Sequence, residues 1–223
     1  MYFRCVFLLL AVAVARSAFP QNIRRITHRD GLSNSSILSL AQDADGYIWA
    51  GSCDGLNLWD GNSARNFRFS GNLIQEIVAT DDGYLWVRTN YGVDRFDTRD
   101  RRIEMLAGFQ RVYKFAARSR DEAFFLHGNK LYGYVASKGA FEPVDVRGAE
   151  LTGVLRMCLD GDGALWLVRS GDIRCAQVAY DADGRASVGE WERMTMPDGV
   201  VFTRYDGDRT IFFTDRNGML FRF

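Results

Sequence analysis

A unit of near 40 residues recurs along this 223-residue chain, and it limits the possible fold more than any other feature. The clearest copy, Asp43 to Gly61, reads DADGYIWAGSCDGLNLWDG. Its short apolar segments are separated by Asp-Gly or Gly turns, because Gly accepts the backbone angles of tight hairpin turns. The central aromatic residues of five successive copies are spaced by 37, 39, 41 and 46 residues: Trp49, Trp86, Phe125, Trp166 and Phe212. The sheet formed by one unit is too small to bury both of its faces alone. The units must therefore stack on one another.

This period, with three or four short strands in each unit, is typical of propeller blades. We therefore predict an all-β fold, a β-propeller of about five four-stranded antiparallel blades that is either complete or part of a larger propeller. The predicted blades occupy residues 36–69, 73–106, 111–146, 151–194 and 200–223 of a propeller domain spanning 19–223. The last blade lacks a fourth strand. The alternating segment 21–28 is predicted to supply it and so to join the two ends of the chain.

Ten positions define the repeat and are predicted to be structural. They are Gly46, Trp49, Gly55, Trp59, Gly83, Trp86, Gly92, Phe96, Gly163 and Trp166. A Trp at a fixed place on the second strand of successive blades indicates packing between blades. Stacking of these rings on sugars is the alternative.

The amino terminus has the anatomy of a secretory signal peptide, predicted over residues 1–18. A short cationic start, Met1 to Arg4, precedes the eleven-residue apolar run from Cys5 to Ala15, and small residues follow. That run is too short for a permanent membrane helix. No other run approaches membrane length, so the chain is expected to be exported without a membrane span.

Cleavage would leave three cysteines, Cys53, Cys158 and Cys175. Cys158 and Cys175 fall on the first and third strands of the fourth unit. Since another strand separates them, they are too far apart for a disulfide. We expect buried free thiols.

The charge balance argues against nucleic acid as a partner, because 28 Lys and Arg residues face 28 Asp and Glu residues. Nearly all the basic residues are Arg. Their stems are predicted to cover aromatic surface on outer strands rather than to form a phosphate site.

Asp-rich turns raise the question of a metal site, since Asp43-x-Asp45-Gly46 recurs as Asp160-x-Asp162-Gly163 and near Asp181. A calcium loop needs further oxygen ligands after the Gly. Apolar strand residues follow at once here, so we interpret these segments as turns and predict no metal and no cofactor.

No catalytic set stands out, and none is predicted. The two histidines, His28 and His127, lie 99 residues apart. A sialidase-type Asp box needs Asp two residues before the turn Gly, and only Asp81 satisfies this; Ala44 and Gly161 do not. Sugar hydrolysis requires paired carboxylates, or a tyrosine nucleophile with an arginine cluster, and no spacing indicates either. The chain is thus expected not to be an enzyme.

The run from Gly31 to Gly61 closely resembles the two-component regulator propeller repeat. The matching residues are Leu32-Ser33-Asn34, Gln42-Asp43, Gly46, Trp49, Gly51, Gly55-Leu56 and Trp59-Asp60-Gly61. In this bacterial family, propellers form the periplasmic sensor part of hybrid two-component systems. They typically respond to breakdown products of complex polysaccharides, and a membrane helix and a histidine kinase follow.

The resemblance implies a periplasmic, carbohydrate-responsive sensing or interaction propeller, truncated before any membrane or kinase part. Its expected partners are an oligosaccharide ligand and further propeller blades or a homodimer partner. The sequence does not indicate which residues bind the ligand. The alternative is a secreted propeller enzyme, a polysaccharide lyase or a glycosidase.

Overall fold

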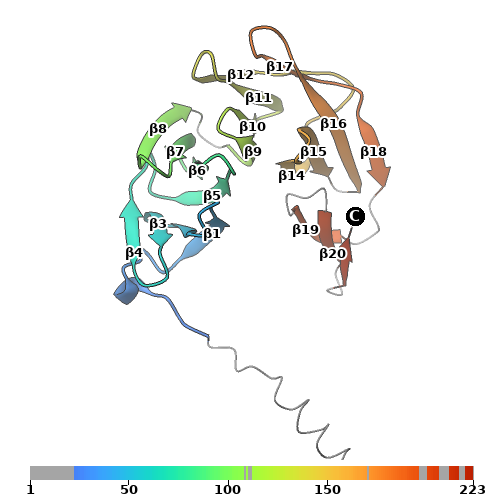
Figure 1. Ribbon diagram of the computed structural model, residues 1–223. Coiled ribbons are helices and arrows are strands. Elements are labelled where there is room, and N and C mark those ends of the chain that lie inside the picture. Colours follow the sequence, from blue (N-terminus) through green and yellow to red (C-terminus); the bar gives the residue numbers. More distant parts are fainter. Residues whose placement is uncertain are drawn as a thin grey trace, which may run out of the picture.

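The computed structural model describes residues 23–107, 109, 112–169, 171–195, 200–205, 211–215 and 219–222. The predicted signal peptide, Cys5 included, lies outside the described residues. Within the described part of the chain, antiparallel sheets stand side by side along an open arc (Figure 1). The first strand of each sheet faces the inside of the arc and the last strand its outside, as in propeller blades. The predicted all-β propeller fold is confirmed.

Blades 1 and 2 are simple four-stranded meanders. Blade 1 contains β1 (Ile37–Gln42), β2 (Ile48–Ser52), β3 (Gly55–Trp59) and β4 (Ala64–Phe67). Blade 2 contains β5 (Ile74–Ala79), β6 (Tyr84–Thr89), β7 (Val93–Asp97) and β8 (Arg102–Ala107).

Blade 3 is a third meander, and blade 4 is larger. Blade 3 contains β9 (Lys114–Ser119), β10 (Glu122–His127), β11 (Lys130–Val135) and β12 (Ala140–Pro143). Blade 4 contains β14 (Val154–Leu159), β15 (Ala164–Arg169), β16 (Asp172–Tyr180), β17 (Ala186–Val188) and β18 (Glu192–Thr195). The start of β16 pairs with β18 and its end pairs with β17, which in turn pairs in parallel with β13 (Asp145–Val146).

Blade 5 has three described strands, β19 (Val200–Tyr205), β20 (Ile211–Asp215) and β21 (Leu220–Arg222). The prediction that segment 21–28 completes this blade is wrong for its described part. Residues 23–27 form no strand, and η1 (His28–Asp30) follows them. This segment instead contacts blade 1, since the Arg24 guanidinium lies 5.2 Å from the Trp59 ring. After η1, the Ser33 amide donates a hydrogen bond to the Asn57 side chain of the same blade. Local contacts with blade 1 thus replace long-range pairing with blade 5.

The Asp-rich segments are turns, as predicted. The Asp43 carboxylate accepts hydrogen bonds from the amides of Asp45 and Tyr47, at 3.1 and 2.9 Å. Gly46 follows with φ of 86°, a left-handed conformation that only Gly adopts without strain. The same turn recurs at Asp160, whose carboxylate accepts from the amides of Asp162 and Ala164.

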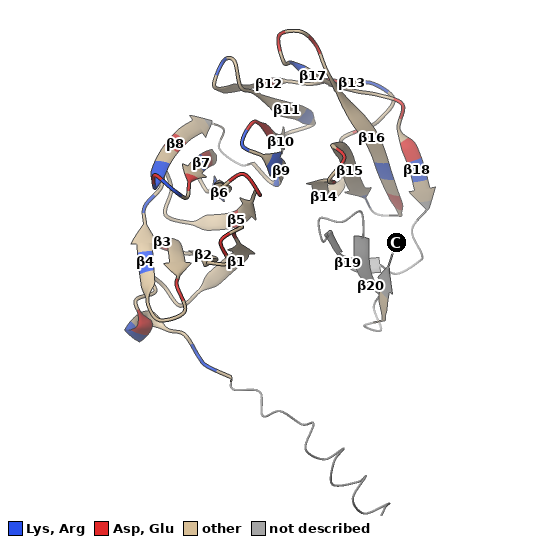
Figure 2. Cartoon of the chain, in the orientation of Figure 1, with Lys and Arg blue, Asp and Glu red and all other residues tan. Residues whose placement is uncertain are grey.

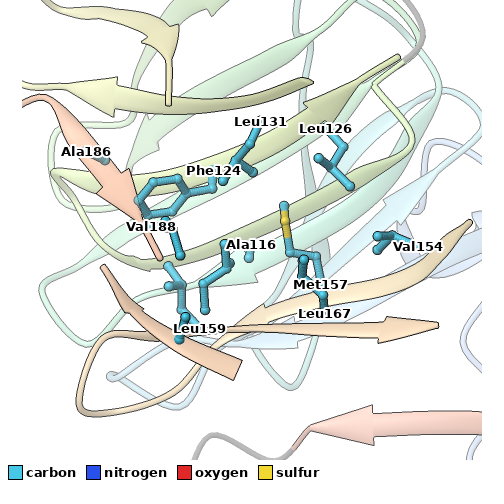
Figure 3. Packing of buried hydrophobic residues seen from close by; sticks show 12 residues of the cluster. Ala116, Phe124, Leu126, Leu131, Val154, Met157, Leu159, Leu167, Ala186 and Val188 are labelled. Carbon is cyan, nitrogen blue, oxygen red and sulfur yellow. The ribbon is translucent and has the colours of Figure 1, made fainter. Parts of the chain in front are cut away.

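The core lies between blades rather than inside any one of them. Three buried clusters fill the spaces between blades 1 and 2, blades 2 and 3, and blades 3 and 4. Figure 3 shows the last of these, where Phe124 and Leu126 of blade 3 share one space with Met157 and Leu167 of blade 4. Burial of such side chains contributes about 1.5–3 kcal/mol each, so each blade depends on its neighbour.

Gly51 shows how closely blades 1 and 2 approach. A Cβ atom placed on Gly51 would lie 2.5 Å from the Ile74 side chain of blade 2 and 2.7 Å from the Ser39 hydroxyl. Only Gly leaves room for Ile74, which is fully buried. Gly51 is therefore required by the packing of blade 1 against blade 2.

Arginine does cover aromatic surface, but in blade 2 it does so through a buried guanidinium on the third strand, β7, rather than through a stem on the outer strand. The Arg95 guanidinium lies 5.6 Å from the Tyr84 and Trp86 rings and 4.9 Å from the Tyr134 ring. It also pairs with Glu104 at 2.6 Å. This buried side chain links blade 2 to blade 3.

Candidate ligand-binding cleft

A β-bulge near the start of the first strand is shared by several blades and shapes the candidate site. The first strands of blades 1, 2 and 4 each carry a β-bulge, between Ile37 and Ser39, Ile74 and Glu76, and Val154 and Arg156. A bulge inserts one unpaired residue and redirects the side chains around it. At the start of the inner strands, the bulges re-aim side chains on one rim of the arc.

A cleft of about 240 Å³ opens on this rim. It is lined by Glu76, Arg88, Tyr113, Lys114, Phe115, Leu155, Arg156 and Met157. Apart from Arg88, which lies near the end of β6, these residues come from the starts of β5, β9 and β14 or directly before β9. Three blades therefore contribute to one site.

The Arg88 side chain in the cleft is fixed by three hydrogen-bond acceptors. Its Nε donates to Glu76 at 2.9 Å, and its Nη1 donates to the Val112 carbonyl at 3.0 Å and to Gln75. Glu76 and Arg88 are direct cross-strand partners in the register of β5 and β6. Arg88 is thus held in place, and Glu76 neutralises its charge.

Two further cations face this pair. Burial lowers the pKa of Lys114, and the positive charges of Arg156 and Arg88 lower it further, while Glu76 opposes the shift. Lys114 and Arg156 line the same cleft. The described lining of the cleft thus contains three cationic side chains and one carboxylate.

The exposed surface of the cleft is almost entirely polar. Its apolar lining residues Phe115 and Met157 are buried.

A second, larger cavity of about 640 Å³ lies where the chain passes from blade 3 to blade 4. It is formed by the β10–β11 turn, by Pro143–Val146 and by residues 149–152. Its lining includes the charged groups of Lys130, Asp145 and Glu150. It lacks the convergence of cations that marks the rim cleft.

The repeat positions predicted as structural lie in turns and interfaces. Trp49 is 1% exposed and Trp86 fully buried, and both lie in the clusters between blades. Trp166 is only half-buried. The indole of Trp49 donates to Asp43 at 2.6 Å, and that of Trp166 to Asp160 at 2.9 Å. Blade 2 has Thr80 at the Asp position, so the Trp86 indole donates to the Ser119 carbonyl of blade 3 instead, at 2.8 Å.

The histidines and cysteines considered as catalytic or metal-binding residues do not come together in one site. His28 lies in η1 and His127 at the end of β10, where it packs against Phe109. Cys53, Cys158 and Cys175 are free thiols, as predicted, but only Cys175 is buried, and Cys53 and Cys158 are half-buried. Trp166 separates Cys158 from Cys175 in the sheet register. Within the described residues, no three His, Cys, Asp or Glu side chains gather in a way that could hold a metal ion.

Charged residues are spread along the coloured part of the arc, blades 1 to 4, with both signs interspersed (Figure 2). The cleft residues were missed by the sequence reasoning for this reason. A signal was present, however: Glu76, Lys114 and Arg156 are charges near the starts of otherwise apolar inner strands. Aligning the repeats on these strands would have placed them on one rim.

The fold and the rim cleft define a class: a propeller scaffold with a ligand-sized site among its inner strands. The model of the two-component regulator propeller family matches residues 31–54. The resemblance seen in the sequence is thus confirmed for the best-formed repeat.

Comparison with known proteins agrees with this class. The chain is 37% identical over 62 residues to histidine kinase P4 of Formosa agariphila, a match that covers 28% of this chain and 4% of that protein. It is also similar to the extracellular domain of BT4673, a proposed hybrid two-component system of B. thetaiotaomicron. That similarity has a TM-score of 0.60 and 22% identity, and covers 86% of this chain and 27% of the other.

A propeller enzyme has the same fold. Virginiamycin B lyase from Staphylococcus aureus aligns with a TM-score of 0.56 and 12% identity, over 85% of this chain and 70% of the lyase. At such identities the likeness shows the fold alone. The chain spans only a small part of the kinase and of the BT4673 domain. No helix in the described residues has the length and apolar character needed to cross a membrane.

Proposed function

We propose that this chain is an exported, periplasmic, non-enzymatic sensing propeller of a hybrid two-component system, and that its ligand is a carbohydrate. The observation that carries the proposal is the rim cleft, in which three blades converge on one site. Binding sites are commonly concave, largely preformed and positioned by a rigid scaffold. The family match at residues 31–54 supports the sensor assignment.

The chemistry of the cleft favours binding over catalysis. Its one carboxylate, Glu76, is engaged by Arg88. A glycosidase needs two carboxylates flanking the scissile bond. Within the described lining of the cleft there is no second carboxylate.

A thermal-shift screen of the exported chain against a panel of neutral and acidic oligosaccharides tests this function. A ligand that binds the folded state raises the melting temperature as its concentration increases. We expect at least one class of oligosaccharide to do so and to be recovered unchanged. Recovery of cleaved sugar, or no shift with any oligosaccharide, contradicts the proposal.

We also propose that a blade from a second copy of the chain covers the free face of blade 1. Leu40 is 66% exposed there, whereas the residues at the equivalent place in blades 2 and 4, Ile77 and Met157, are each 7% exposed. Those two residues lie in the clusters between blades. The repeat therefore indicates that Leu40 belongs to an interface of the same kind.

Light scattering after size exclusion tests this partner. We expect a concentration-dependent dimer that Leu40→Glu abolishes. Met105→Glu, at an exposed site on the outer strand β8, is the matched control and should leave the dimer intact. A wild-type chain that stays monomeric at every concentration contradicts the proposal.

A further inference from the structure

Three arginine side chains gather around one buried carboxylate in blade 4, where strands β16 and β18 lie side by side (Figure 1). Asp172, the first residue of β16, is buried. Its Oδ2 lies 3.1 Å from the Nε of Arg174 and 3.0 Å from the Nε of Arg193. Its Oδ1 lies 3.9 Å from the Nε of Arg169, the last residue of β15. We call these four residues the arginine cluster.

The strand register places two of these arginines directly opposite each other. Arg174 of β16 and Arg193 of β18 are cross-strand partners, and like charges in that position destabilise a sheet. Asp172 lies two residues before Arg174, so it projects from the same face of the sheet. A single oxygen of its carboxylate serves both guanidinium groups. Asp172 therefore offsets only part of the repulsion between them.

The charges of the arginine cluster do not balance within the described part of the chain. The one further carboxylate paired with it there is that of Glu150, 3.7 Å from Arg169. Glu192 adjoins Arg193 in sequence but projects from the opposite face, where its carboxylate lies 4.0 Å from the Cys175 thiol. Three guanidinium groups thus share two carboxylates among the described residues.

The terminal nitrogens of Arg174 and Arg193 suit a phosphate or sulfate group. Both side chains approach Asp172 through Nε, and the described residues provide no hydrogen-bond acceptor for their Nη groups. A guanidinium presents its N–H donors in a planar fork that matches two oxygens of such an anion. Arg174 exposes 20% of its side chain and Arg193 68%. The first is therefore held against the sheet, and the second leaves the pair open to solvent.

We propose that the arginine cluster binds a phosphate or sulfate group between the Nη groups of Arg174 and Arg193. Arg169 adds a third positive charge. Asp172 positions the arginines and, through its own charge, limits the affinity. None of these residues lines the rim cleft, so the inference is independent of the proposed function. The anion is either free in solution or an ester substituent of a larger ligand.

Calorimetric titration of the chain at constant ionic strength tests the inference with four probes: inorganic phosphate, inorganic sulfate, glucose 6-phosphate and glucose. We expect phosphate or sulfate to bind once per chain, with a dissociation constant of about 1 mM or tighter, and glucose not to bind. Glucose 6-phosphate binding as tightly as phosphate supports a site for an ester substituent. Binding at least about tenfold weaker supports a site for the free anion.

Three substitutions locate the site. Arg174→Gln and Arg193→Gln should each weaken phosphate binding about tenfold, because each removes charge-assisted contacts. Arg185→Gln is the matched control and should change nothing. Arg185 is also an exposed, ion-paired arginine, 3.0 Å from Glu142, but it lies outside the arginine cluster.

A fourth substitution separates an anion site from a purely structural network. Asp172→Asn removes the internal anion, so phosphate should raise the melting temperature of this variant more than that of the wild-type chain. If Asp172→Asn does not fold, the affinity of Arg193→Gln decides, because Arg193 is the most exposed member of the cluster.

Two results overturn the inference. One is phosphate and sulfate binding no more tightly than glucose. The other is unchanged phosphate affinity in both Arg174→Gln and Arg193→Gln. Equal stabilisation of Asp172→Asn and the wild-type chain by phosphate also contradicts it. The proposed function is tested with oligosaccharides, so either proposal can fail while the other stands.

Discussion

Replacement of Asp43 by Ala tests how the repeat links its turn to the core between blades. The Asp43 carboxylate accepts two turn amides through one oxygen and the indole of Trp49 through the other, at 2.6 Å. The two amides lie in a partly exposed turn where water can replace the lost acceptor, so their loss costs about 1 kcal/mol. Trp49 is almost fully buried, so its N–H would be left without a partner, at a cost of about 1–3 kcal/mol.

The sum predicts that Asp43→Ala lowers the free energy of unfolding by about 3 kcal/mol. For a chain of this size, that corresponds to a decrease of roughly 6–12 °C in melting temperature. Urea unfolding followed by tryptophan fluorescence provides the free energy, and calorimetry provides the melting temperature.

Asp181→Ala is the matched control within the same chain. Asp181 caps the same type of turn, accepting from the amides of Asp183 and Arg185 at 3.0 and 2.8 Å. It is exposed and has no indole partner among the hydrogen bonds of the described residues. Its loss should cost about 1 kcal/mol.

A double-mutant cycle with Trp49→Phe isolates the indole bond. In the Trp49→Phe background, Asp43→Ala should cost only about as much as Asp181→Ala, because the indole donor is already gone. Equal losses for Asp43→Ala and Asp181→Ala in the wild-type background, or strictly additive effects in the cycle, would refute the reasoning.

Three further predictions concern packing, titration and thiol chemistry. Gly51→Ala should destabilise the chain by about 1–3 kcal/mol in urea unfolding, because the new methyl group would lie 2.5 Å from the Ile74 side chain. Gly189→Ala is the control and should be close to neutral, because a methyl group there would lie 3.9 Å from its nearest neighbouring atom. Burial raises the pKa of Asp94 above 3.8, so its contribution to stability is present below pH 3.8 and is lost as the pH rises through the folded-state pKa. Asp94→Asn should therefore stabilise the chain at pH 7, with a gain in stability that disappears towards pH 3.8. A gain that is independent of pH would contradict this. Asn57 already occupies the equivalent place in blade 1, where it accepts from the Ser33 amide as Asp94 accepts from the Ser70 amide. Burial raises the pKa of the Cys158 thiol from 9.0 to about 12, so at pH 8 it should react with a disulfide reagent about a thousandfold more slowly than in urea, and modification at equal rates would rule this out.

The propeller could be predicted because its determinants are local and repeated. The Asp43 turn, Gly46 and Trp49 act within one blade or on the next blade, and the same spacing of Gly and Trp recurs in blades 2 and 4. The turns of each unit, and the face that it buries, can therefore be predicted from the residues of that unit alone.

Features that depend on distant parts of the chain could not be predicted in this way. Whether segment 23–27 pairs with blade 5 or lies near blade 1 is decided by competing surfaces, and alternation alone does not distinguish them. The long β16–β17 hairpin was expected, but its contact with the preceding blade was not. There the Tyr180 hydroxyl donates to Glu122 at 2.7 Å and Arg185 donates to Glu142 at 3.0 Å.

The cleft was missed for a related reason. Glu76, Lys114 and Arg156 are separated by about 40 residues each and are ordinary charges in the sequence. Only the stacking of blades brings them together, and only the bulges in β5 and β14 set their direction. Half-buried Trp166 shows the same limit, since its exposure depends on its neighbours rather than on its motif.

Hydrogen exchange of the chain with and without an oligosaccharide that raises its melting temperature tests the central claim most directly. The account predicts simultaneous protection of three segments that are distant in sequence, residues 74–77, 112–116 and 154–157, with no change at the β8 strand. Protection confined to one of these segments, or located only elsewhere in the chain, would contradict the claim that stacked blades assemble a single binding site.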